Sequence, residues 1–332
     1  MPFNVAKQSL IPAFLSLLIL VIIALCNTTE SLVAGELRFG LTPEVLPIPS
    51  FGRWLQQFEG AHPILAHLIG AFLMLYTGTS LGRLTVRYNL YGTGTCLAIP
   101  IYGLAMLGAM QGGNYLTAIV CSTLLMLSIK NLCFSYRNGF GFDRIFRGAL
   151  FLALLIWIAP AASPLVLLLT TVSKRFRRTT REMIVALCGL LLPIAVICYL
   201  NWALGGALIA PLRMWYAAFM EGSWGDAVLH ATLKEQLFGG VMIALTLMGL
   251  ALFSINSYNV NTKARHILQL CGRLLLLTLV TLAMPSASIA TLALLSVPVT
   301  LLLPVLFIRI HQPIAQTLYP LLIVAAVASL FL

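Results

Sequence analysis

Residues able to do acid–base chemistry are few in this sequence, and two of them lie just beyond its first apolar segment. Glu30 follows that segment by a few residues, and Glu36 lies further along the same polar stretch. A carboxylate held beside a membrane can take a proton from a hydroxyl group, or can hold a divalent metal against a phosphate. Glu30 and Glu36 are therefore the candidate catalytic residues. The alternative for both is an ordinary solvated acid in a loop.

Two basic residues and two histidines are the candidate substrate-binding residues. Arg213, His230 and Lys234 lie in one polar segment, where they can bind a phosphate or pyrophosphate. His62 precedes Pro63 at the start of an apolar segment, a pair typical of a helix that begins at a membrane boundary. The alternative is that all four side chains are interfacial groups that reach lipid head groups.

Motifs for bound cofactors are missing from the sequence. It has no phosphate-binding loop, no HExxH pair and no dinucleotide fingerprint. His62 and His67 are five residues apart, which is not ligand spacing on one helical face. We therefore predict no cofactor, and a divalent metal at the glutamates has no further support.

These residues lie in a very apolar chain. Of its 332 residues, 60% are hydrophobic and 9% are charged, and its mean hydropathy is +0.99. Such a composition excludes a soluble enzyme, a nucleic-acid-binding protein and a disordered chain. Apolar runs of about twenty residues exclude a β-barrel, whose strands alternate. The sequence predicts an all-α, polytopic transmembrane helix bundle that forms one domain over residues 1–332.

Nine segments are long enough to cross a bilayer about 30 Å thick. They are 9–26, 61–81, 91–110, 116–135, 183–202, 238–256, 267–284, 288–308 and 314–332. The first reads as an uncleaved anchor because further spans follow it. A tenth apolar stretch, 148–172, is interrupted by Pro160 and Pro164, and each half is too short to cross comfortably. We expect a hairpin of two short helices, buried in the bundle.

The positive-inside rule favours this hairpin and a cytoplasmic N-terminus. With the hairpin, the basic loop 174–181 stays in the cytoplasm, and so do Lys263, Arg265 and Arg309. The cytoplasmic side then carries 16 basic and two acidic residues, and the opposite side carries four basic and seven acidic residues. Lys130 and Arg273 lie about two turns inside their spans, within snorkelling reach. The net charge of +11 therefore indicates orientation in a membrane and no nucleic-acid partner.

Two segments on the acidic side are long enough to carry a function. In 27–60, the residues Phe51, Trp54, Leu55 and Phe58 follow helical spacing, which predicts an amphipathic helix in the interface. In 205–239, Pro211 begins a second interfacial helix, and a third short one follows Asp226.

Two resemblances follow from these features. The run from Asp143 to Leu165, with 174–181 and Gly189 to Pro193, resembles an uncharacterised family of bacterial polytopic inner-membrane proteins. The layout is more distantly similar to C-type (GT-C) glycosyltransferases, with a cytoplasmic N-terminus, a long first external loop and a His-Pro-x-Leu start at His62. Such enzymes transfer sugars from polyprenyl-phosphate donors with an acidic residue early in that loop. The resemblance implies that role for Glu30, although the paired acidic motif of that superfamily is missing.

Two functions follow as hypotheses. The first is a membrane glycosyltransferase that handles a polyprenyl-linked sugar at the outer leaflet during envelope assembly. The second is a non-enzymatic, permease-like or scaffold subunit of a membrane protein complex, which the scarcity of acids favours. In both, the lipid bilayer is the first partner.

Overall fold

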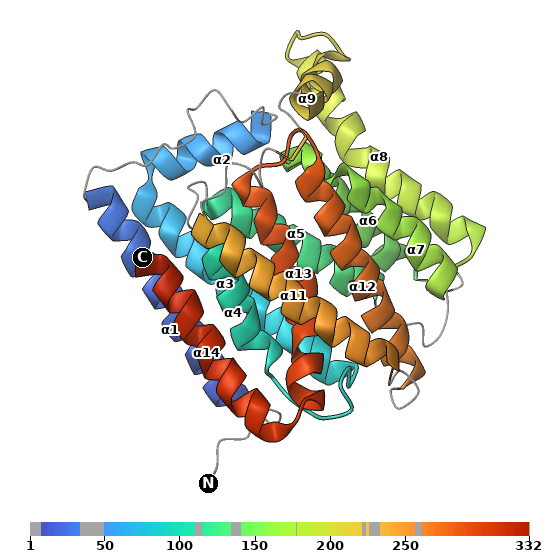
Figure 1. Ribbon diagram of the computed structural model, residues 1–332. Helices are drawn as coiled ribbons and strands as arrows, with labels where there is room; N and C mark the ends of the chain where they lie inside the picture. The colour runs from blue at the N-terminus through green and yellow to red at the C-terminus, as the bar shows by residue number, and fades with distance from the viewer. Residues whose placement is uncertain are drawn as a thin grey trace.

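The protein is described by a computed structural model over residues 8–33, 50–109, 115–133, 141–176, 178–220, 224–225, 233–255 and 261–331. Helices joined by turns make up all of this part of the chain (Figure 1). The α-helices are α1 (Leu10–Val33), α2 (Ser50–Ala61), α3 (Pro63–Arg87), α4 (Ala98–Ala109), α5 (Tyr115–Leu132), α6 (Phe142–Ile158), α7 (Leu167–Phe176), α8 (Thr180–Ala203), α9 (Ala210–Met220), α11 (Leu233–Ile255), α12 (Thr262–Ala283), α13 (Ile289–Arg309) and α14 (Gln312–Phe331). A 3₁₀-helix, η2 (Pro160–Val166), joins α6 to α7.

Six of the described helices are long and apolar enough to cross a membrane. They are α3, α5, α8, α11, α12 and α13. The apolar parts of α1, α4 and α14 are shorter, at 10–17 residues. The nine predicted spans therefore correspond to nine helices, of which six have full membrane-crossing length. The helix α4 is shorter than the predicted span 91–110 because the chain turns at Gly92, which has a φ of 75°, and the helix begins only at Ala98.

Two helices, α4 and α13, form the centre of the bundle. Both are apolar around the whole helix, as expected for helices without an exposed face. In α4, Ile99, Ile101 and Leu104 have no solvent contact, and most of α13 is likewise enclosed. The helices α1, α3, α5, α11, α12 and α14 pack around them.

Buried hydroxyl groups connect four helices across this centre. The Tyr102 hydroxyl lies 3.1 Å from Ser122 Oγ, which lies 3.0 Å from Ser296 Oγ. Thr77 and Thr123 form a further pair at 2.9 Å. These contacts link α3, α4, α5 and α13, where hydrogen bonds between side chains replace the hydrophobic driving force that lipid does not supply.

The chain folds back on itself between α6 and α8. Gly141, before α6, donates its N–H to Glu182 in the first turn of α8 at 3.3 Å. One to two helical turns further along both helices, Gly189 of α8 lies against the carbonyl oxygen of Phe146 of α6. The two helices therefore run in the same direction, and η2 with α7 returns the chain to its starting level. The turn falls at Pro160–Val166, between the two prolines and just after them.

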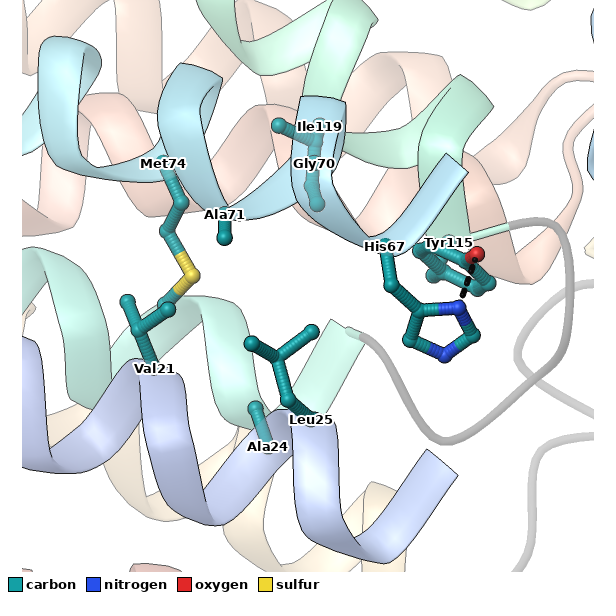
Figure 2. Close-up of a pocket in the computed structure, with 9 residues that line it drawn as sticks. All are labelled: Val21, Ala24, Leu25, His67, Gly70, Ala71, Met74, Tyr115 and Ile119. Carbon is teal, nitrogen blue, oxygen red and sulfur yellow. Dashed lines mark hydrogen bonds between the residues drawn. The ribbon is translucent and has the colours of Figure 1, made fainter. Parts of the chain in front are cut away.

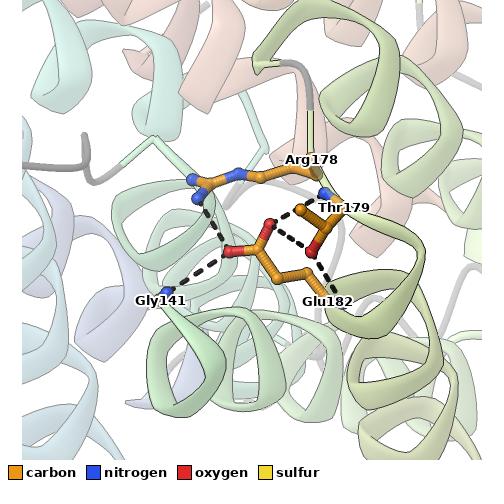
Figure 3. A network of polar contacts seen from close by, with 4 residues as sticks. All are labelled: Gly141, Arg178, Thr179 and Glu182. Carbon is orange, nitrogen blue, oxygen red and sulfur yellow. Dashed lines mark hydrogen bonds and ion pairs between the residues drawn. The ribbon is translucent and has the colours of Figure 1, made fainter. Parts of the chain in front are cut away.

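A buried polar network holds the ends of this return together (Figure 3). Glu182 accepts from the Thr179 N–H at 3.0 Å, and Thr179 Oγ1 accepts from the Glu182 N–H at 3.4 Å. This reciprocal pair is a capping box, which the Thr-Thr-Arg-Glu sequence of residues 179–182 favours at a helix start. Arg178 adds an ion pair to the same carboxylate at 3.4 Å.

The alternating helix directions give the bundle two distinct ends. We call the first the α2 end; it carries α2 and α9 (Figure 1). We call the second the basic end; it carries the first turns of α6, α8 and α12 and the last turns of α3, α5, α7 and α13. Its basic residues in these turns include Arg87, Lys130, Arg144, Lys174, Arg181, Lys263 and Arg309.

Candidate functional site

The helix α2 lies across the α2 end and continues into α3 through a bend at His62. Leu55 is buried against the bundle, while the Trp54 ring is half-exposed and stacks on Phe58 at 5.7 Å. The His62 N–H donates to the Phe58 carbonyl at 2.9 Å, and Pro63 then occupies the first position of α3. The His62 side chain is exposed and lies edge-on to Phe58 at 5.6 Å.

Glu59 links α2 to the first turn of α5. Its Oε2 atom accepts from the Leu116 N–H at 3.3 Å, where the backbone groups of a helix N-terminus favour a negative charge. Burial raises the pKa of Glu59 to about 7, although hydrogen bonds from the N–H groups of Leu116 and Tyr115 lower it. This carboxyl group therefore changes charge near neutral pH.

His67 and Tyr115 form a buried pair beside Glu59. The His67 Nδ1 atom lies 2.5 Å from the Pro63 carbonyl oxygen and 2.8 Å from the Tyr115 hydroxyl. A carbonyl oxygen only accepts, so Nδ1 carries the proton and donates to it. That tautomer leaves the lone pair on Nε2, which points away from Tyr115 toward the end of α1 (Figure 2).

An apolar crevice begins at this pair and runs between α1, α3 and α5 (Figure 2). It is lined by Val21, Ala24, Leu25, His67, Gly70, Ala71, Met74, Tyr115 and Ile119. Gly70 keeps α3 and α5 close, because a Cβ there would lie 3.2 Å from Ile119. The crevice is too narrow in this conformation to hold a water molecule. It thus has an apolar body with an imidazole and a phenol at one end.

Of the predicted catalytic residues, Glu30 belongs to the same end of the bundle. The first helix continues to Val33, beyond the predicted span, so the backbone of Glu30 lies in the last turns of α1 and not in a loop. It follows Leu25, which lines the crevice, by five residues, or about 7.5 Å along the axis. Glu36 lies outside the described residues.

The predicted substrate-binding residues do not come together in the described part of the chain. Arg213 is exposed on α9, which packs mainly on α8 and η2, and Trp215 of the same helix donates to the Ile156 carbonyl at 3.1 Å. Lys234 lies in the first turn of α11, and His230 falls outside the described residues. His62 lies at the bend between α2 and α3, five residues before His67, and the roles of all four remain predictions.

No group of three potential metal-binding side chains occurs among the residues described. Glu59, His62 and His67 come from adjoining elements but do not converge as a ligand set. The alternative of a divalent metal at Glu30 or Glu36 lies outside this comparison, since the structure describes neither side chain.

Sequence reasoning missed Glu59, His67 and Tyr115. A signal was present for the first two, because Glu59 follows Phe58 on the packed side of an amphipathic helix and His67 is an ionisable residue inside an apolar span. Tyr115 gave none, because its partners are 48 and 52 residues away along the chain.

No protein-family model matches this chain, and neither a curated protein nor a solved structure does. The chemistry of the α2 end is therefore the basis on which a function rests.

Proposed function

We propose that the protein is a glycosyltransferase-like enzyme of the bacterial inner membrane that handles a polyprenyl-phosphate-linked sugar at the α2 end. One observation carries the proposal: an apolar crevice ends at the His67–Tyr115 pair, on the same end of the bundle as Glu30. An isoprenoid chain with a phosphate at its tip has the same division into an apolar body and a polar end.

The surroundings of the crevice suit a substrate that arrives from the bilayer. Ile64, Leu68 and Phe72 are exposed on α3, as expected of a face that meets lipid. The half of α1 nearer the basic end is held tightly by its neighbours. Leu17 packs so closely against α3 and α4 that a Cβ on Gly78 or on Gly103 would lie within 3 Å of its side chain. We therefore expect the crevice to widen by movement of the outer half of α1, around Leu25.

The proposed reaction assigns one role to each group. Glu30 takes the proton of the acceptor hydroxyl, whose oxygen forms a bond to C1 of the sugar. The bond from C1 to the phosphate oxygen breaks, and the polyprenyl phosphate leaves with the electron pair. The leaving phosphate lies at the polar end of the crevice, beside the His67 imidazole and the Tyr115 hydroxyl, and Tyr115 keeps the imidazole ring in place.

Photo-crosslinking of a polyprenyl phosphate tests the binding step. A photoreactive farnesyl phosphate added to the full-length protein in mild detergent should label peptides from α1 and α3 around the crevice. Tyr115→Phe should lower the yield several-fold, because it removes one hydrogen bond that orients His67. Tyr102→Phe is the matched control, since it removes another buried hydroxyl away from the crevice. Equal labelling by the two variants, or by farnesol, would contradict the proposal.

Glu30→Gln tests the chemical step. The variant should bind the photoreactive lipid like the wild type but should not release polyprenyl phosphate from a polyprenyl-phosphate-linked sugar in the presence of membrane acceptors. Folded Glu30→Gln protein that releases it at the wild-type rate would remove Glu30 from the mechanism.

A second candidate function, a scaffold subunit of an envelope-assembly complex, is supported by the α8–α9 arm. In this arm α8 packs mainly on α6 and exposes Tyr199 and Trp202, and α9 packs on α8 and η2 and exposes Tyr216. Purification in mild detergent with a stable membrane partner, lost in Trp202→Ala and Tyr216→Ala, would favour the scaffold. A monomer that retains a polyprenyl phosphate would favour the enzyme.

A further inference from the structure

A single arginine, Arg273, lies deep in α12, and none of the residues that the structure describes forms an ion pair with it. Arg273 is half-buried and is 11 residues from the start of the helix at Thr262, or about 16 Å along the axis. Its helix contains no acidic residue. The acids described at the basic end, Asp143 and Glu182, pair with Arg147 and Arg178, and no hydrogen bond or ion pair within the described part of the chain reaches Arg273. A cation at this depth in an apolar helix calls for a partner.

Two more polar groups with unmet hydrogen bonds lie on the same side of α12. His266 Nδ1 and Gln269 Oε1 are both buried and have no hydrogen-bond partner among the described residues. The His266 ring lies 6.3 Å from Phe176 of α7. Arg273 is seven residues further, which is two turns, so it lies on the same flank of the helix. The three residues therefore follow the seam between α12 and the α7–η2 return.

These three side chains converge in the direction of the basic end. Side chains on a helix lean toward its N-terminus, and the N-terminus of α12 is at the basic end. Arg273 therefore reaches back toward the level of Gln269 and His266. The Arg273 guanidinium, the Gln269 Nε2 amide group and an N–H of the His266 ring are donors from which a phosphate oxygen accepts, whereas Gln269 Oε1 only accepts and takes no part.

The face of α12 changes from polar to apolar beyond Arg273. Leu276 and Val280 lie on the same side of α12 as Arg273, nearer the α2 end, and are 56% and 45% exposed. A polar patch at the basic end followed by an apolar lane matches a phospholipid, whose head group lies at the interface and whose acyl chain runs toward the centre of the bilayer. A soluble anion would use only the polar part.

We propose that an anionic phospholipid of the leaflet at the basic end binds along α12, with its phosphate on Arg273, Gln269 and His266 and one acyl chain over Leu276 and Val280. The surplus of basic side chains at this end attracts anionic lipids to the site. This site lies at the opposite end of the bundle from the crevice and does not depend on the function proposed above.

Native mass spectrometry of the full-length protein in mild detergent tests this site. Dioleoyl phosphatidylglycerol should add to the wild type at low micromolar concentration, and dioleoyl phosphatidylcholine should add much less. Arg273→Gln should weaken the phosphatidylglycerol adduct about tenfold or more, as expected for loss of a hydrogen bond to a charged group. Lys263→Gln, which removes an exposed charge from the first turn of the same helix, should change it less than about twofold.

Three results would overturn the proposal: an unchanged adduct in Arg273→Gln, an equal adduct with phosphatidylcholine, or displacement of the lipid by millimolar inorganic phosphate, which would indicate a soluble ligand. If Arg273→Gln does not fold, Gln269→Leu and His266→Phe provide the same comparison. Each should weaken the adduct severalfold, and wild-type binding by both would equally refute the site.

Discussion

Two carboxylates at the basic end both pair with arginine, but they differ in burial. The Arg178 and Glu182 side chains are 3% and 0% exposed, whereas Arg147 and Asp143 are 62% and 70% exposed. Removing one partner of a buried pair leaves an uncompensated charge, which costs about 3–5 kcal/mol. An exposed pair in adjacent turns contributes roughly 0–1 kcal/mol.

We therefore predict that Glu182→Ala lowers the unfolding midpoint of the detergent-solubilised protein strongly and that Asp143→Ala barely changes it. Glu182 also accepts from Gly141 and Thr179, so its loss should loosen both ends of the α6–α7 return. Thermal unfolding followed by tryptophan fluorescence measures both variants. Equal midpoints would show that the buried network contributes no more than a surface pair.

Glu59 should make the stability of the protein depend on pH. Because the folded pKa of about 7 exceeds the ordinary value of 4.5, the folded protein holds this proton over a range in which the unfolded chain has lost it. Stability contributed by Glu59 is therefore present below about pH 4.5 and falls as the pH rises to about 7. The whole change is roughly 3 kcal/mol at most.

Glu59→Gln should remove this dependence, since an amide oxygen can still accept from Leu116 but does not titrate. Between pH 5 and 8, the unfolding midpoint of the wild type should fall relative to that of the variant. Asp143→Asn, at an exposed acid, is the control and should follow the wild type. Parallel curves for the wild type and Glu59→Gln would contradict the assigned role.

At the scale of elements, the helices α6 and α8 approach each other closely at Gly189. A Cβ on Gly189 would lie 2.6 Å from the Phe146 carbonyl oxygen, so Gly189→Ala must separate the two backbones. Small residues at such contacts are what allow helices to associate in lipid. We predict that Gly189→Ala lowers the unfolding midpoint, with a loss of about 1–3 kcal/mol.

Gly240→Ala in α11 is the matched control, because nothing lies within 4 Å of its Cβ position. It should be neutral or slightly stabilising, since alanine favours helix more than glycine does. A similar loss in the two variants would mean that the α6–α8 contact does not set the effect of Gly189→Ala.

Apolar segments made the helices predictable, but their lengths and neighbours were not. The run from residue 91 to 110 is continuous in composition, yet Gly92 turns the chain and α4 begins at Ala98. At the first helix the error is opposite, because the polar residues after Cys26 continue the helix to Val33. Apolar composition predicts which segments can lie in lipid, whereas the ends of these helices are set by backbone geometry and tertiary packing.

The candidate site was predictable only in the residues that stand out along the chain. Glu30 and His62 could be placed at one end of the bundle, because each adjoins the same side of an apolar segment. The pairing of His67 with Tyr115 could not, because it depends on how closely α3 and α5 approach at Gly70. Packing between distant segments leaves no trace in local spacing.

At the scale of the whole molecule, the two ends of the bundle differ in charge, and this difference predicts the orientation in the membrane. Thr180, in the first turn of α8, is exposed at the basic end, and Trp224 is exposed after α9 at the opposite end. In a cysteine-free background, Thr180→Cys in intact cells should react only with a maleimide that crosses the membrane, because basic residues favour the cytoplasm. Trp224→Cys should also react with an impermeant maleimide.

The results of the two labelling tests depend on each other, because α8 joins the two positions and the return of the chain through η2 and α7 sets the direction of α8. Labelling of Thr180→Cys from outside would invert the whole bundle and would place the crevice and Glu30 on the cytoplasmic side, where a sugar donor at the outer leaflet could not reach them.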